Sequence, residues 1–90
     1  MRRDPADYEG QQLELVYIAR RLQEAKEVEG LLDHHGIDYT IQVEHYRGGI
    51  IFVGLRAGAF FYVLEDAAAR SRDLLRQFRY TPQEPPGGSS

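Results

Sequence analysis

The sequence predicts an α+β domain in which two helices cover one face of a small sheet. Residues 13–41 read as a strand, a helix and a second strand in quick succession. Residues 48–64 are the most apolar run, and glycines interrupt it among β-branched and aromatic residues, as is typical of strands and turns. An amphipathic helix follows over 65–79. The expected order is therefore strand, helix, strand, one or two further strands, helix, in two layers.

The first strand is expected over residues 13–19, which are rich in Leu, Val, Tyr and Ile. Strict alternation would place Leu15 and Tyr17 on one face, and Val16 and Ile18 on the other. Both faces are apolar, which indicates that both are covered. We expect the helices to cover one face and a partner chain to cover the other.

A helix is expected over residues 22–35, where apolar side chains recur at three- and four-residue spacing. Gly36 stands where a left-handed residue would end this helix. Residues 37–44 then alternate between apolar and polar side chains, which predicts a strand with one wet face. Two strands joined by a helix favour a parallel pair with a right-handed crossover. The expected helix stripe is Ala25, Val28, Leu31, Leu32 and His35.

The apolar run over 48–64 is too short for a membrane-spanning helix of about 20 residues and contains Arg56. One interpretation is a hairpin with strands over Ile50–Leu55 and Phe60–Leu64. Its turns would lie at His45–Gly49 and Arg56–Gly58.

The alternative is one long flap over Tyr46–Gly58 between two main strands, and the sequence does not separate the two interpretations. The final helix opens with Glu65 and Asp66, where the helix dipole favours acidic side chains. Pro82 lies beyond its end. Its expected inner stripe is Ala67, Ser71, Leu74, Leu75 and Phe78.

The chain length of 90 residues corresponds to one domain, expected over residues 13–79. Residues 1–12 are polar and expected to be flexible, and residues 80–90 form a Pro/Gly/Ser tail expected to be disordered. Domains below roughly 70–80 residues rarely gain enough stability from one core alone. The chain has no cysteine, so disulfides and thiolate metal sites are excluded. Association is the remaining way to add buried surface, and we expect a homo-oligomer, with a dimer as the simplest form.

The formal net charge of −3 argues against a general nucleic-acid-binding protein, which needs a basic surface. The polar start of the chain has no hydrophobic signal segment, so we expect a cytoplasmic protein that does not bind membranes.

Three stretches of the chain resemble a small bacterial family of signal-transducing proteins, a domain of unknown function. They are LVYIARRLQEAKEVEGLLDHHGI, HYRGGIIFVGLRAG and FYVLEDAAARSRDLL, within residues 13–78. The resemblance implies a ferredoxin-like sandwich similar to the nitrogen-regulatory P-II signal proteins. It also implies an effector-binding loop between the second and third strands, which would fall within residues 45–58. No effector-binding motif of that group is present, so only the position of the loop is carried over.

Candidate sites for small ligands are few. His34, His35 and His45 are the only histidines, and neighbouring helix residues point about 100° apart, so a metal site is not expected. Arg47, Gly48 and Gly49 could form a small anion cradle with His45 nearby, although a turn is the more common use of such glycines. No group pairs a nucleophile with a base, so no catalytic residue or cofactor is assigned.

We therefore expect a non-enzymatic cytoplasmic module that acts through homo-oligomerisation and binds a small effector or protein partner at residues 45–58. The alternatives are a small enzyme or enzyme subunit with a site between subunits, using His45 and Arg47, and a purely structural self-association domain. The expected interface lies on the sheet face opposite the helices. Its candidate residues are Val16, Ile18, Phe61 and Val63.

Overall fold

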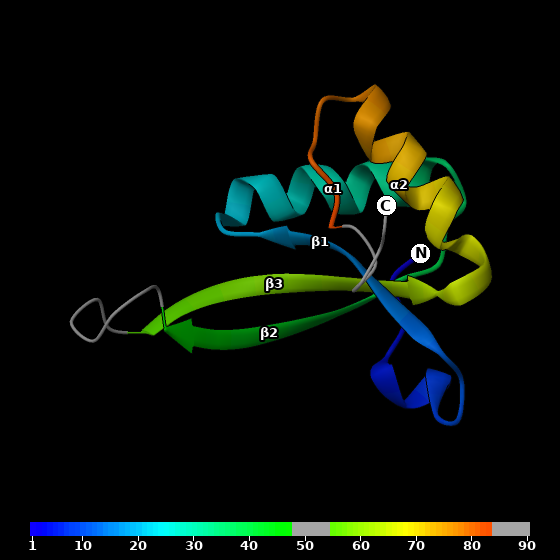
Figure 1. Ribbon diagram of the computed structural model, residues 1–90, viewed down its shortest axis with the longest axis horizontal. Coiled ribbons are helices and arrows are strands. Elements are labelled where there is room, and N and C mark those ends of the chain that lie inside the picture. Colours follow the sequence, from blue (N-terminus) through cyan, green and yellow to red (C-terminus); the bar gives the residue numbers. More distant parts are fainter. Residues whose placement is uncertain (48–54, 84–90) are drawn as a thin grey trace, which may run out of the picture.

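A computed structural model describes residues 1–47 and 55–83 and contains one antiparallel sheet with two α-helices in a second layer (Figure 1). This arrangement confirms a small two-layer α+β fold. The elements in chain order are η1 (Pro5–Tyr8), β1 (Leu13–Ala19), α1 (Leu22–His34), β2 (Thr40–Arg47), β3 (Leu55–Leu64), η3 (Glu65–Ala67) and α2 (Ala68–Gln77), where η marks a short 3₁₀ helix.

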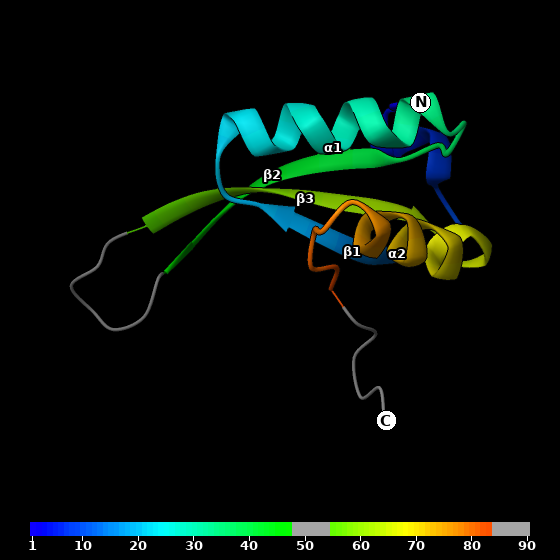
Figure 2. The same cartoon turned by 90° about the horizontal axis from the view of Figure 1, so that it is seen from above.

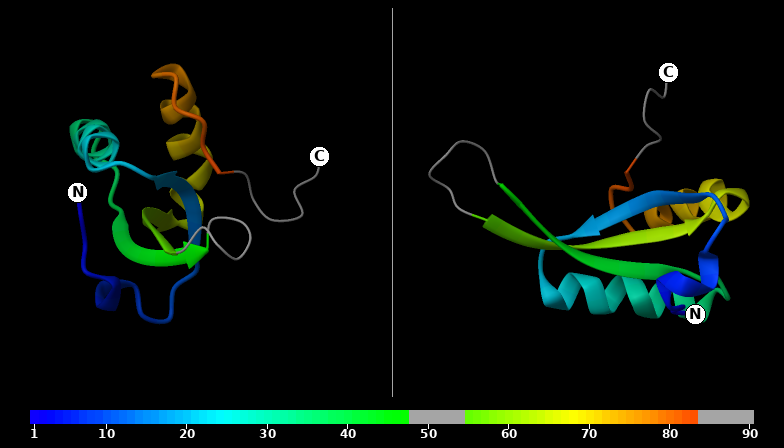
Figure 3. Two further views of the ribbon diagram at one scale, coloured as in Figure 1. Left: turned by 90° about the vertical axis from the view of Figure 1, so that its left-hand side faces the viewer. Right: turned by 90° about the horizontal axis from the view of Figure 1, so that it is seen from below.

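The strand order is β1-β3-β2, so the last strand of the chain lies at the centre of the sheet. β3 is antiparallel to both neighbours, and β1 and β2 therefore run parallel to each other without being adjacent. Both helices lie on the same face of the sheet (Figure 3). Seen from above, α1 lies on the β2 side and α2 on the β1 side (Figure 2). The opposite sheet face, which carries no α-helix, is called the open face below.

A bulge in β1 changes which side chains face the helices. Leu15 lies opposite Tyr62 and Tyr17 lies opposite Phe61, so Val16 is the extra residue between them. Val16 and Tyr17 are consequently both buried on the helix side, at 0% and 6% exposure. The expected alternation along this strand is therefore wrong after Leu15, although the strand bounds agree with the prediction.

The hairpin of β2 and β3 is longer than expected. β2 continues to Arg47 and pairs there with Leu55, and Tyr46 pairs with Arg56. Residues 45–47 and 56–58, which were expected in turns, are therefore strand residues. The alternative flap over 46–58 loses residues at both ends for the same reason, because 46–47 and 56–58 belong to strands. Apart from Leu55, the expected strand Ile50–Leu55 lies outside the described residues, as do Gly48 and Gly49.

The hydrophobic core fills the space between the sheet and the two helices. α1 contributes Ala25, Val28 and Leu32, as its spacing predicts, whereas His35 lies just past the helix end and is exposed. Phe78, expected on the inner stripe of the final helix, lies just past the end of α2 and is half exposed. The core residues without any exposed surface include Val16, Val28, Leu32, Tyr39, Phe61, Val63 and Leu75.

Both ends of the described chain make contacts that the sequence did not indicate. Arg2 bridges to Tyr39 beside β2, and the Arg3 N–H donates to the Tyr39 carbonyl at 2.6 Å. At the other end, the Gln83 N–H donates to the Val16 carbonyl at 2.8 Å, so residues 80–83 run beside β1. The rest of the expected tail, residues 84–90, lies outside the described residues. Within 1–47 and 55–83, neither helix has the length and apolar character needed to cross a membrane.

Candidate interaction surface

The most exposed apolar site lies where the hairpin of β2 and β3 projects past the start of α1 (Figure 1). Two large side chains stand there, Leu22 with 73% and Val43 with 66% of its surface exposed. Between them is a hollow of about 270 Å³ with an almost wholly apolar lining. Its lining residues are Ala19, Arg20, Arg21, Leu22, Ala25, Val43, Gly58 and Ala59. We call this site the apolar notch.

The local structure explains why these two side chains are exposed. Leu22 is the first residue of α1, three residues before Ala25, and its side chain is exposed whereas those of Ala25 and Val28 are buried. Val43 pairs with Ala59 and its register places it on the helix side of the sheet, yet its exposure shows that α1 does not cover it. The notch therefore forms because the hairpin is longer than the helix layer above it.

Three of the four expected interface residues lie in the core and not on the open face. Val16, Phe61 and Val63 have no exposed surface and pack beneath the helices. The cause is the bulge in β1 together with the register of β3, which turns Phe61 and Val63 towards the helices. The structure thus corrects the face assigned to these residues. Only Ile18, opposite Phe60, lies on the open face, and it is half-buried.

The open face is partly covered by the chain itself. η1 lies on the side of the sheet opposite the helices (Figure 3). Its Tyr8 is 7% exposed, and burial, followed by the charge of Asp38, raises the pKa of this phenol. The hydroxyls of Tyr8 and Thr40 are buried without a hydrogen-bond partner among the described residues. This cover leaves less of the open face available for a partner than the sequence suggested.

The expected ligand residues are only partly described. His45 and Arg47 belong to β2, where they pair with Ala57 and Leu55 of β3. Their partners in the expected anion cradle, Gly48 and Gly49, fall in the segment that the structure does not describe. The geometry therefore gives no support to a cradle at these four residues and does not test it.

The remaining histidines pack as surface aromatics. The rings of His34 and His35 meet edge to face at 5.1 Å, and His35 contacts Phe78 in the same way at 6.1 Å. The His35 Nδ1 lies 3.0 Å from the Leu31 carbonyl. Among the side chains that the structure describes, which leave out those of residues 44–57 and 84–90, no three from His, Asp or Glu converge as metal ligands.

The notch residues were not identified from the sequence. Val43 was assigned to the apolar face of its strand, which is correct for its register, but its exposure depends on where α1 begins in space. Leu22 precedes Ala25 by three residues, so its spacing gave no sign that it would be exposed. No family model, curated protein or solved structure matches the chain.

Proposed function

We propose that this protein is a non-enzymatic module that acts by binding a second copy of itself through the apolar notch. The observation that carries the proposal is the exposure of Leu22 and Val43 on either side of an apolar hollow. Fully burying a Leu or Val side chain stabilises an assembly by about 1.5–3 kcal/mol. An exposed apolar site of this kind is typical of a surface that binds a partner.

A second copy is the favoured partner because of the size of the domain. The core contains residues from about 16 to 75, which is a short span for one hydrophobic core to stabilise alone. In a two-fold dimer the same patch meets itself, so Leu22 of one chain would pack near Val43 of the other. Such a contact adds buried apolar surface without requiring a different protein.

We further propose that the domain has the ferredoxin-like arrangement implied by its resemblance to the signal-transducing family. The strand order β1-β3-β2, with α1 connecting two parallel outer strands, supports this proposal. In that arrangement a fourth strand would pair with the outer edge of β1. Residues 80–83 run along this edge and are held by the bond from Gln83 to Val16. A regulatory role, with an effector contacting the connection between β2 and β3 near His45 and Arg47, is part of the same proposal.

The proposal is tested by placing charge in the notch. The double variant Leu22→Glu/Val43→Glu should give a monomer, whereas the unchanged protein should give a dimer in size-exclusion chromatography with light scattering. Leu22→Glu suits the fold, because an acidic residue is favourable in the first turn of a helix. A circular dichroism spectrum like that of the unchanged protein would show that the variant remains folded, and its melting temperature should be lower because the monomer lacks the buried contact.

The matched control is Gln42→Glu. Gln42 is exposed and neighbours Val43, but its register places it on the open face, opposite Phe60. This variant should remain dimeric although it gains one negative charge per chain. A folded double variant that keeps the dimeric mass would refute the notch as the contact surface.

A further inference from the structure

Both helices end in the same hydrogen-bonded motif. At the end of α1, the Ile37 N–H donates to the Leu32 carbonyl at 3.0 Å, and Gly36 between them has φ of 70°. This pattern is the Schellman motif, in which the residue past the helix must adopt a left-handed conformation. Glycine adopts that conformation without a steric cost from a side chain.

At the end of α2 the same position is occupied by an arginine. The Tyr80 N–H donates to the Leu75 carbonyl at 2.9 Å, and Arg79 has φ of 68°. Arg79 is the only residue other than glycine with a positive φ among residues 1–47 and 55–83. A left-handed conformation is unfavourable for a residue with a Cβ atom, so this arginine is present at some cost to folding.

Arg79 lines a hollow with a volume of about 680 Å³. The hollow lies between the end of β1, the start of α1 and the segment that follows α2, which descends past α1 towards β1 (Figure 1). Its volume falls within the range of about 300–1,000 Å³ typical of small-molecule sites. The lining residues are Tyr17, Ile18, Arg20, Arg21, Gln23, Glu24, Glu27, Arg79, Tyr80, Thr81 and Gln83. We call this hollow the arginine cavity.

The first carboxylate in the arginine cavity is that of Glu24, and both of its oxygens accept hydrogen bonds from neighbouring groups. One oxygen of Glu24 accepts a hydrogen bond from the Tyr17 hydroxyl, and the other accepts from the Arg20 N–H at 3.1 Å. Burial, and then the bond to Glu24, raises the pKa of Tyr17, so the phenol stays a neutral donor. Glu24 thus serves to position the turn between β1 and α1.

The second carboxylate is used in the same way. Glu27 accepts from the Tyr80 hydroxyl at 2.9 Å on one oxygen and from Gln23 Nε2 at 3.3 Å on the other. The rings of Tyr80 and Tyr17 meet edge to face at 5.7 Å. The two tyrosine–glutamate pairs therefore form a fixed aromatic wall, and neither carboxylate has an oxygen without a protein donor.

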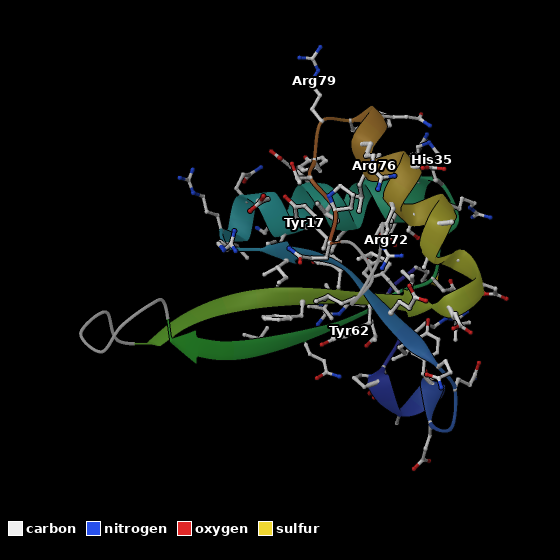
Figure 4. All side chains as sticks on the ribbon, viewed as in Figure 1. Tyr17, His35, Tyr62, Arg72, Arg76 and Arg79 are labelled. Atoms are coloured by element: carbon white, nitrogen blue, oxygen red, sulfur yellow. The ribbon has the colours of Figure 1, made fainter. Side chains whose placement is uncertain are left out.

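Two of the arginines that line the arginine cavity have fewer protein partners than its two glutamates. Among the side chains that the structure describes, Arg21 and Arg79 have no ion-pair partner. Figure 4 shows the exposed Arg79 side chain extending outward from the segment after α2 and away from Tyr17, so it has to turn back to contact a ligand in the cavity. Three arginines and two glutamates line the cavity, which leaves one positive charge in excess. Guanidinium groups bind phosphate through paired hydrogen bonds.

We propose that the arginine cavity binds a small organic phosphate, with Arg79 and Arg21 contacting the phosphate group and Tyr17 and Tyr80 contacting the organic part. The proposal explains why an arginine stands at a position where glycine would fold better. It also assigns a use to a cavity whose acidic groups are already occupied. The arginine cavity adjoins the notch, because Arg20 and Arg21 line both hollows, but Leu22 and Val43 do not line the cavity.

The decisive experiment compares Arg79→Gly with the unchanged protein. Amide NMR shifts are followed while phenyl phosphate is added, with inorganic phosphate and benzoate as separate probes. Phenyl phosphate should shift residues 17–24 and 79–83 in a saturable manner, more tightly than either smaller probe. Arg79→Gly should weaken this binding by about tenfold or more and at the same time raise the melting temperature by about 4 °C.

The control is Lys26→Gln, which removes one positive charge from an exposed residue of α1 outside the cavity lining. It should leave binding within about twofold of the unchanged protein. Arg21→Gln should weaken binding without raising the melting temperature. The proposal is overturned by the absence of saturable shifts at millimolar phenyl phosphate, by equal affinity for benzoate or inorganic phosphate, or by unaltered binding to Arg79→Gly.

Discussion

Arg72 of α2 and Glu14 of β1 form an ion pair beneath the surface, with 2.9 Å between Nη1 and Oε1. The Arg72 side chain is only 8% exposed. The same guanidinium donates to the Leu15 carbonyl at 3.0 Å and to the Gln83 carbonyl at 2.6 Å. One side chain, labelled in Figure 4, therefore joins α2, β1 and the segment after α2.

Removing this guanidinium should destabilise the fold. Arg72→Met keeps much of the side-chain volume but leaves Glu14 and two buried carbonyls without their donor. We expect the free energy of unfolding to fall by about 2–4 kcal/mol in urea denaturation. Arg76→Met is the matched control, because Arg76 pairs with Asp73 at an exposed site and should change stability by at most about 1 kcal/mol. Equal losses in both variants would contradict the joining role of Arg72.

Phe61 should behave as a core residue and not as an interface residue. It has no exposed surface and contacts the rings of Tyr17 and Tyr39. Phe61→Ala should lower the free energy of unfolding by about 3–5 kcal/mol, measured by chemical denaturation. Ile18→Ala on the open face should cost clearly less, because Ile18 is only half-buried. A Phe61→Ala protein that keeps its stability but loses its oligomeric state would contradict the assignment to the core.

Alkaline pH should destabilise the protein through its buried tyrosines. Burial is the main cause that raises the pKa values of Tyr17 and Tyr39 above the ordinary value of 10.0. The folded state therefore holds these protons more tightly than the unfolded state. Their contribution to stability is complete below about pH 10 and is lost as the pH rises through the folded pKa.

The melting temperature should therefore fall as the pH rises from about 9 to about 11. Tyr17→Phe removes one of the tyrosines with a raised pKa and should give a flatter dependence on pH, although the loss of the bond to Glu24 lowers stability at neutral pH by about 1 kcal/mol. An equally steep alkaline decline in this variant would show that Tyr17 is not one of the groups responsible.

The sequence predicted those features that depend on local pattern. The bounds of β1 and the start of α1 followed from composition and spacing, and Gly36 marked the end of α1 by its left-handed conformation. Gly30 is exposed, with open space where a Cβ would lie, as a tolerated surface glycine should be. These features could be predicted because neighbouring residues alone decide them.

Features that depend on pairing between distant segments could not be predicted in this way. The bulge at Val16 is set by the register against β3, and it moved Tyr17 to the helix side. The partner of Arg72, Glu14, lies 58 residues away, so no local pattern indicates this ion pair. Arg79 is distinguished from its neighbours only by its backbone conformation.

The same limit applies to the candidate sites. Alternation placed Val16, Phe61 and Val63 on an interface, because an apolar strand gives no sign of which face the helices cover. The exposure of Val43 depends on the length of the hairpin relative to α1. The face that the helices cover and the exposure of Val43 both depend on how the helices pack on the sheet.

The most direct test of self-association is the native mass of the purified protein over a wide range of concentration. The apolar notch predicts a concentration-dependent dimer that disappears in Leu22→Glu/Val43→Glu and persists in Gln42→Glu. A monomer at every concentration, in a protein that is folded by circular dichroism, would contradict the proposed function.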